Sequence, residues 1–117
     1  WRFILRQADT PPGHLPMVYS VQQIKFEIYS YIKEFDSDFS KWYIGIASDP
    51  KAEMQQKHGV DLEKDIWLYK QAVSFPACRT IQRHFLEQLQ VDGEPMLRGS
   101  EDTDCVYLYK KSERTTP

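Results

Sequence analysis

The apolar positions of residues 20–35 recur at intervals of three and four, which is the spacing of one face of an α-helix. Ser20 and Gln23 form the S-x-x-Q pattern of a capping box, so we expect the helix to begin directly after Ser20. Asp36 and the polar residues after it end the pattern. The apolar stripe of this helix comprises Val21, Ile24, Ile28, Tyr31, Ile32 and Phe35.

Residues 42–46 predict a short, mostly buried strand that leads into a second, shorter helix. Their aromatic and β-branched side chains suit a pleated segment, and Gly45 interrupts them where another backbone or a ligand can approach closely. Asp49 can cap the next helix, and Pro50 has the φ that a first helical position needs. Gly59 supplies a left-handed residue after its end.

A third helix is predicted over residues 75–90. Ser74 can cap its first turn, which contains Pro76. Its apolar stripe comprises Ala77, Ile81, Phe85 and Leu89.

Two further strands are predicted, at residues 66–69 and 105–109. In the last strand, alternation places Val106 and Leu108 on one face and the two tyrosines on the other. The order of elements favours an α/β (α+β) fold, with residues 1–117 as a single small domain. We expect a short central sheet of about three strands, flanked by helices.

The two ends of the chain lack a regular pattern. Residues 1–19 predict an extended lead-in on the surface, because their prolines remove backbone donors and fix φ. Residues 2–5 are the one part of this lead-in with the character of a short strand. Residues 112–117 predict a flexible polar tail.

The composition predicts a folded protein outside the membrane. The chain has 117 residues, of which 41% are hydrophobic, and a net charge of −2. No apolar run approaches the roughly 20 residues that a membrane span needs, and no signal peptide is visible. Cys78 and Cys105 lie on different predicted elements without metal-ligand companions, so we expect free buried thiols, with a disulfide as the alternative. Free thiols favour a cytoplasmic location, which we therefore expect.

The acidic residues are concentrated in residues 92–104, which predict a long polar loop. This loop lacks the ligand spacing of an EF-hand. We expect a solvated loop, with a cation site or a partner contact as alternatives. The acidic balance of the whole chain disfavours undirected binding to nucleic acid, although a local basic patch can outweigh it.

The stretch Tyr43-Ile44-Gly45, followed by His58 in the next predicted helix, resembles the second half of the GIY-YIG nuclease motif. In that family the helix after Tyr-Ile-Gly carries a catalytic arginine and often a histidine, and a later helix carries a metal-binding glutamate. Residues 77–82 resemble that later helix, so the resemblance covers roughly residues 40–110.

The resemblance implies that Tyr43 lies beside the scissile phosphate and that His58 carries a proton or contacts phosphate. The residues alone support a plainer interpretation. In it Tyr43 packs on the sheet, and His58 caps a helix C-terminus, where the helix dipole favours its positive form.

Two substitutions in the motif oppose catalysis. Glu53 stands at the arginine position and Gln82 at the glutamate position. Cleavage of a phosphodiester needs a cation to stabilise the charge that develops on the phosphoryl oxygens, and a glutamate adds repulsion instead. An amide also lacks the negative charge that Mg²⁺ prefers among its oxygen ligands. We therefore expect no metal site and no cofactor.

The chain also departs from the family in its partner strand. No Gly-Ile-Tyr sequence occurs, and a predicted helix precedes Trp42 where the family has a hairpin. If the resemblance holds, residues 2–5 must supply the partner strand or the partner strand must be absent.

Three functions are compatible with the sequence. The favoured one is a non-catalytic binding module on a degenerate GIY-YIG-like scaffold, which binds nucleic acid, a nucleotide or a protein partner. One alternative is a metal-dependent endonuclease with a rearranged site. The other is a protein-interaction or inhibitor domain, which the acidic loop favours over a nucleic-acid-binding module. Candidate catalytic residues are Tyr43 and His58. Candidate binding residues are Tyr43, Lys51, His58, Arg79 and Arg83, with scattered solvated lysines as the alternative interpretation.

Overall fold

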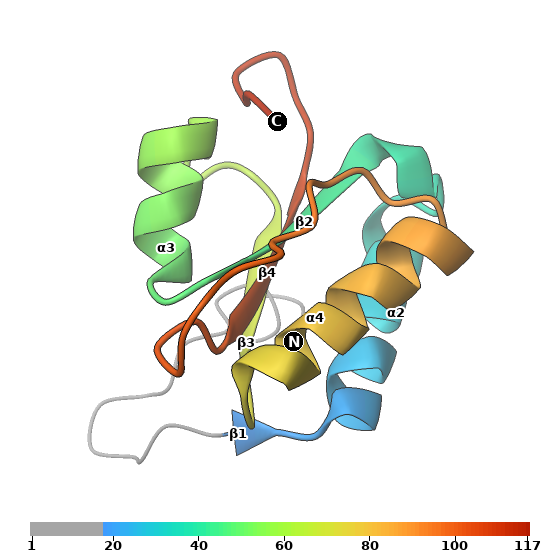
Figure 1. Ribbon diagram of the computed structural model, residues 1–117. Coiled ribbons are helices and arrows are strands. Elements are labelled where there is room, and N and C mark those ends of the chain that lie inside the picture. Colours follow the sequence, from blue (N-terminus) through green and yellow to red (C-terminus); the bar gives the residue numbers. More distant parts are fainter. Residues whose placement is uncertain (1–17) are drawn as a thin grey trace, which may run out of the picture.

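Within residues 18–117, four strands form one mixed sheet in the order β1-β3-β4-β2 (Figure 1). The structure is a computed structural model that describes residues 18–117, so the strand expected at residues 2–5 lies outside the described residues. The strands are β1 (Val18–Tyr19), β2 (Trp42–Ala47), β3 (Trp67–Ala72) and β4 (Cys105–Lys110). β1 runs parallel to β3, whereas β4 is antiparallel to both β3 and β2.

The expectation of about three strands is wrong by one strand. The additional strand is β1, which lies at the end of the predicted lead-in and pairs with only Gln71 and Ala72. A strand of two residues is too short to show an alternating pattern, so no local signal marks it. The three strands that the sequence does predict lie together in this sheet, as expected.

The two longer helices cover one face of the sheet. α2 (Val21–Phe35) begins at a complete capping box, in which the Ser20 and Gln23 side chains and backbones bond reciprocally. α4 (Phe75–Arg83) is capped by Ser74 and continues as a π-helical turn, η3 (His84–Gln88). The apolar stripes of α2 and α4 pack together on β2, β3 and β4, which confirms the predicted helix packing.

The opposite face of the sheet is covered by a shorter helix. α3 (Pro50–Ala52) continues as a π-helical turn, η2 (Glu53–Lys57), and lies on the other side of the sheet from α2 and α4 (Figure 1). A short 3₁₀ turn, η1 (Phe39–Lys41), leads into β2. All six residues of β2 are buried because both faces are covered. Its alternate residues therefore enter two cores: Ile44 packs with α2 and α4, and Tyr43 packs with Met54 near α3.

The last residues of the chain lie against the α3 side of the sheet. The Lys111 N–H donates to the Lys41 carbonyl at 2.8 Å, and the Thr116 N–H donates to the His58 carbonyl at 2.7 Å. Arg114 forms an ion pair with the buried Asp65. The residues predicted as a flexible tail therefore make specific contacts with the turn that follows η2.

Cys78 and Cys105 are free, buried thiols, as expected. None of the helices in the described residues is long and apolar enough to cross a membrane.

The buried thiols predict a loss of stability at alkaline pH. Burial raises the pKa of both Cys78 and Cys105 from 9.0 to about 12. The folded protein keeps these thiols neutral, whereas the unfolded chain ionises them above about pH 8.5. The free energy of unfolding is therefore highest below that pH and falls as the pH rises toward about 12. Guanidinium unfolding at increasing alkaline pH measures the decline, which should be shallower in the Cys105→Ala variant. An unfolding midpoint that does not change with pH would refute it.

Candidate functional site

Three tyrosines and a histidine meet on the α3 face of the sheet. The antiparallel register of β2 and β4 places Tyr43 opposite Tyr109 and Gly45 opposite Tyr107. The ring centroids of Tyr43 and Tyr109 are 5.2 Å apart, and those of Tyr43 and His58 are 4.7 Å apart. Of the sequence-predicted site residues, Tyr43 and His58 are thus in direct contact.

Gly45 makes room for the Tyr107 ring. A Cβ atom on Gly45 would lie 2.3 Å from Cζ and 2.4 Å from the hydroxyl oxygen of Tyr107. Such distances are far below van der Waals contact, so the ring can lie across β2 only because position 45 has no side chain. The sequence predicts that another group approaches the backbone closely at Gly45. In the structure this group is the Tyr107 ring of the neighbouring strand, β4.

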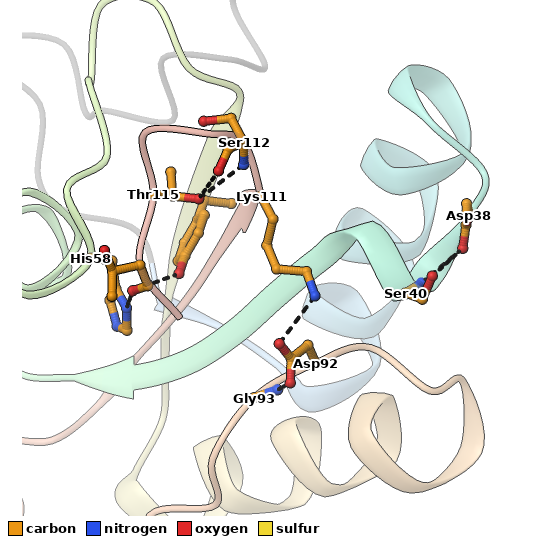
Figure 2. Close-up of polar contacts among 10 residues, drawn as sticks. Asp38, Ser40, His58, Asp92, Gly93, Lys111, Ser112 and Thr115 are labelled. Atoms are coloured by element: carbon orange, nitrogen blue, oxygen red, sulfur yellow. Dashed lines mark hydrogen bonds and ion pairs between the residues drawn. The ribbon is translucent and has the colours of Figure 1, made fainter.

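His58 is 2% exposed, and both of its ring nitrogens are engaged inside the protein. Nδ1 lies 2.8 Å from the Thr116 carbonyl oxygen, and Nε2 lies 2.8 Å from the Tyr107 hydroxyl. A carbonyl oxygen only accepts, so Nδ1 donates to it and the Nε2 of a neutral ring accepts from Tyr107. Figure 2 shows the His58 ring beside the last residues of the chain. This bonding gives His58 a structural role and leaves neither ring nitrogen free for a ligand.

Tyr43, Gly45 and Tyr107 line a pocket of about 160 Å³ beside β2. A second pocket of about 370 Å³ adjoins it along the end of β2 and the start of α3. The two pockets form one groove, hereafter the β2 groove. They share the lining residues Ile46, Glu53, Lys57 and Met96.

The β2 groove is negatively charged around the Tyr43 hydroxyl. The pKa of Tyr43 is raised first by burial and then by the negative charges of Glu94, Asp92 and Glu53. Among the lining residues that belong to the described part of the chain, residues 18–117, Lys57 is the one cation, and its Nζ lies 3.4 Å from a Glu53 carboxylate oxygen. A phosphate in this groove would therefore meet carboxylates whose charge is only partly compensated.

Gln82 does not line the β2 groove, but its side chain forms hydrogen bonds with residues 94–96, which do. Gln82 is 2% exposed. Its Nε2 donates to the Glu94 carbonyl at 3.1 Å, and its Oε1 accepts from the Met96 N–H at 3.3 Å. The amide thus uses a donor and an acceptor together, which a carboxylate cannot do. The position that resembles the metal-binding glutamate serves here as an anchor for residues 94–96.

We expect the substitution Gln82→Glu to destabilise the protein. The carboxylate would lose the bond to the Glu94 carbonyl and place a buried charge beside that oxygen, at a loss of about 1–3 kcal/mol in the free energy of unfolding. Gln88→Glu, on the exposed surface of η3, is the matched control and should change stability by less than about 0.5 kcal/mol. Equal unfolding midpoints for the two variants in urea would contradict the anchoring role.

The other predicted binding residues do not line the β2 groove. Lys51 Nζ lies 5.9 Å from the Trp67 ring centroid, and the Arg79 guanidinium lies 5.8 Å from the Phe75 ring centroid. Arg79 and Arg83 line a different pocket of about 170 Å³, on the α4 side of residues 95–97. The five candidate binding residues therefore do not form one anion-binding face.

β4 is the antiparallel partner of β2, in place of a hairpin strand before Trp42. Within residues 18–117, α2 and η1 precede β2, so no hairpin strand comes directly before Trp42. Residues 2–5 lie outside the described residues, so a partner strand from them stays a prediction. Tyr107 is a site residue that is not among the candidates predicted from the sequence. The alternation of residues 105–109, which places the two tyrosines on one face, was the signal that could have found it.

Among residues 18–117, no group of three or more His, Cys, Asp and Glu side chains is placed to hold a metal ion. Comparison of the chain with protein-family models, with curated proteins and with solved structures finds no match. The resemblance to GIY-YIG nucleases therefore stays a prediction.

Proposed function

We propose that this domain is a non-catalytic module that binds a protein partner through cationic side chains placed in the β2 groove. One observation carries the proposal: Tyr43 lines the β2 groove together with the carboxylate residues Glu53 and Glu94. Burial raises the pKa of the Tyr43 hydroxyl, and the negative charges of Glu94, Asp92 and Glu53 raise it further. Carboxylates with a tyrosine hydroxyl complement an ammonium or guanidinium group and repel phosphate.

The lysines near the groove are already paired with carboxylates, which supports a protein partner over nucleic acid. Figure 2 shows the Lys111 side chain pointing toward Asp92. Lys111 Nζ lies 3.1 Å from Asp92 Oδ2, and Lys57 is paired with Glu53. Lys41, at the end of η1, and Lys110, at the end of β4, each have Nζ 3.6 Å from Asp36 Oδ2. Binding to nucleic acid draws on cations that are available to neutralise phosphates, and these lysines already face carboxylates.

Glu53 and Gln82 are the two residues because of which we propose a module without catalytic activity. Glu53 lines the β2 groove beside Tyr43, so a carboxylate stands where phosphoryl transfer needs a cation. Gln82 is committed to the backbone of Glu94 and Met96. Neither residue is placed to perform the role that the GIY-YIG resemblance assigns to its position.

Binding titrations test the proposal. A fluorescein-labelled oligolysine peptide and a labelled single-stranded oligonucleotide of equal length are titrated with protein at low salt and followed by anisotropy. We expect the peptide to bind, with an affinity that falls as salt rises, and the oligonucleotide not to bind. The double variant Glu53→Gln, Glu94→Gln should weaken peptide binding about tenfold, because each rim charge contributes up to about 1 kcal/mol.

A charge-matched control separates the groove from net charge. The double variant Glu27→Gln, Glu113→Gln removes two carboxylates that do not line the groove, and its peptide affinity should stay within about twofold of the unmodified protein. Tighter binding of the oligonucleotide than of the peptide, or equal weakening in both double variants, would overturn the proposal.

The second candidate function is a metal-dependent endonuclease with a rearranged site. The direct contact of Tyr43 with His58 favours it, since the GIY-YIG resemblance implies that these two residues share a site. The engagement of both His58 nitrogens and the charge of Glu53 oppose it.

A further inference from the structure

The outer edge of β2 carries backbone groups that point away from β4. The Lys111 N–H donates to the Lys41 carbonyl, so residue 41 and every second residue after it bond toward β4. The alternate residues, Trp42, Ile44 and Ile46, then direct their N–H and C=O groups to the outside of the sheet.

Residues 92 and 93 cover only the first part of this edge. The Asp92 N–H donates to the Trp42 carbonyl at 3.0 Å, and the Asp92 carbonyl accepts from the Ile44 N–H at 2.9 Å. Gly93 lies against the Ile44 carbonyl oxygen, which would be 2.4 Å from a Cβ at that position. The chain then turns toward Gln82. The Gln82 side chain donates a hydrogen bond to the Glu94 carbonyl and accepts one from the Met96 N–H.

The pairing of the edge therefore stops before Ile46. Within residues 18–117, neither the N–H nor the C=O of Ile46 has a hydrogen-bond partner across the outer edge. Ile46 lines both parts of the β2 groove, although it belongs to the core packed under α2 and α4, so its backbone is the part that can face the groove. Ile46 is 2% exposed, and Met96 lines the groove beside it. We therefore expect the Met96 side chain to move outward when a ligand pairs with these backbone groups. Buried, unpaired backbone groups are unfavourable, and pairing them releases that free energy.

We propose that an extended peptide segment of a basic protein partner adds to β2 as a further strand and pairs with the backbone of Ile46. This inference rests on the proposed function and specifies how the partner is held. Main-chain hydrogen bonds supply affinity in this mode of recognition, and alternate side chains supply specificity. Side chains on the α3 face of the added strand would meet Glu53, and the groove continues past Ser48 and Asp49.

The charge of the groove selects a basic partner over a second copy of this chain. Two β2 edges brought together would place Glu53 and Glu94 of one copy near the same residues of the other. Like charges at an interface oppose association, whereas lysine or arginine side chains complement these carboxylates.

Amide hydrogen exchange at Ile46 tests the strand addition. The probe is a capped hexapeptide of alternating lysine and valine, added to ¹⁵N-labelled protein. In the free protein we expect the Ile46 amide to exchange at least tenfold faster than the amides of Gly45 and Ala47, which bond to β4. The peptide should slow exchange at Ile46 by about tenfold or more, while Gly45 and Ala47 stay unchanged.

Two variants sharpen this test. A peptide with alternate backbone nitrogens methylated keeps its charge and loses its main-chain donors, so it should bind about tenfold more weakly. The substitution Met96→Ala keeps the backbone bond to Gln82 and uncovers the edge, so it should raise the affinity for the unmethylated peptide.

The outcomes separate this inference from the proposed function. If the methylated peptide binds equally well and Ile46 stays unprotected, strand addition is overturned while binding of cations in the groove stands. If neither peptide binds at millimolar concentration, strand addition is overturned. If Ile46 becomes protected without peptide as the protein is concentrated, a second copy is the occupant, which also overturns it. Preferential binding of an oligonucleotide removes the proposed function together with this inference.

Discussion

Replacement of Gly45 by alanine should lower the free energy of unfolding by about 3 kcal/mol or more, the upper part of the range for overpacked cores. The new Cβ would lie 2.3 Å from Tyr107 Cζ, so the ring must move. The ring is held by the hydrogen bond of its hydroxyl to His58 and by its burial at 3% exposure, so movement disrupts the whole aromatic cluster. Urea unfolding of Gly45→Ala measures the loss.

The double variant Gly45→Ala, Tyr107→Leu identifies the clash as the cause. Leucine is shorter than tyrosine, so the two substitutions together should destabilise the protein by less than the sum of their separate effects. Additive effects would show that the alanine disrupts something other than the Tyr107 ring. Unchanged stability of Gly45→Ala alone would show that the ring does not lie across β2.

Replacement of His58 by alanine should lower the free energy of unfolding by about 3–5 kcal/mol, as for other large buried side chains. The substitution removes a buried ring that packs on Tyr43 and Tyr109. It also removes the acceptor of the Tyr107 hydroxyl and the 2.8 Å hydrogen bond to the Thr116 carbonyl, which keeps the longer bond from the Tyr109 hydroxyl at 3.5 Å. The control is His84→Ala, because His84 is only partly buried, and its loss should be much smaller.

A double-mutant cycle separates the hydrogen bond from the packing. The cycle combines His58→Ala with Tyr107→Phe, and we expect a coupling energy of about 1 kcal/mol. If His58→Ala keeps the stability of the unmodified protein, the structural role of His58 is contradicted. His58 would then again be a candidate for a chemical role.

The helices could be predicted because their signals are local. The capping box of Ser20 and Gln23 and the caps at Asp49 and Ser74 fix where α2, α3 and α4 begin, and the structure contains all three. The strands β2, β3 and β4 were also visible as short apolar runs. The order of these strands in the sheet cannot be predicted from such local runs, because strand pairing joins residues far apart in the sequence, such as Gly45 and Tyr107.

The candidate site could be predicted only in part for the same reason. Tyr43 and His58 lie within one strand-to-helix stretch, and their contact follows from that short connection. The role of Gln82 depends on where residues 94–96 pass, which no pattern in its own helix reveals. Whether Lys51 converges with Arg79 and Arg83 likewise depends on packing. In the structure the two arginines line one pocket, and Lys51 is not part of it.

Incubation with nucleic acid and a divalent metal tests the non-catalytic site most directly. Labelled single- and double-stranded DNA and RNA are incubated with the protein and Mg²⁺ or Mn²⁺, and the products are resolved on a denaturing gel. Because Glu53 opposes a phosphate beside Tyr43 and Gln82 is held by the backbone of residues 94–96, we predict intact substrates with the unmodified protein and with Tyr43→Phe alike. Cleavage by the unmodified protein that disappears in Tyr43→Phe would contradict this account and establish the endonuclease.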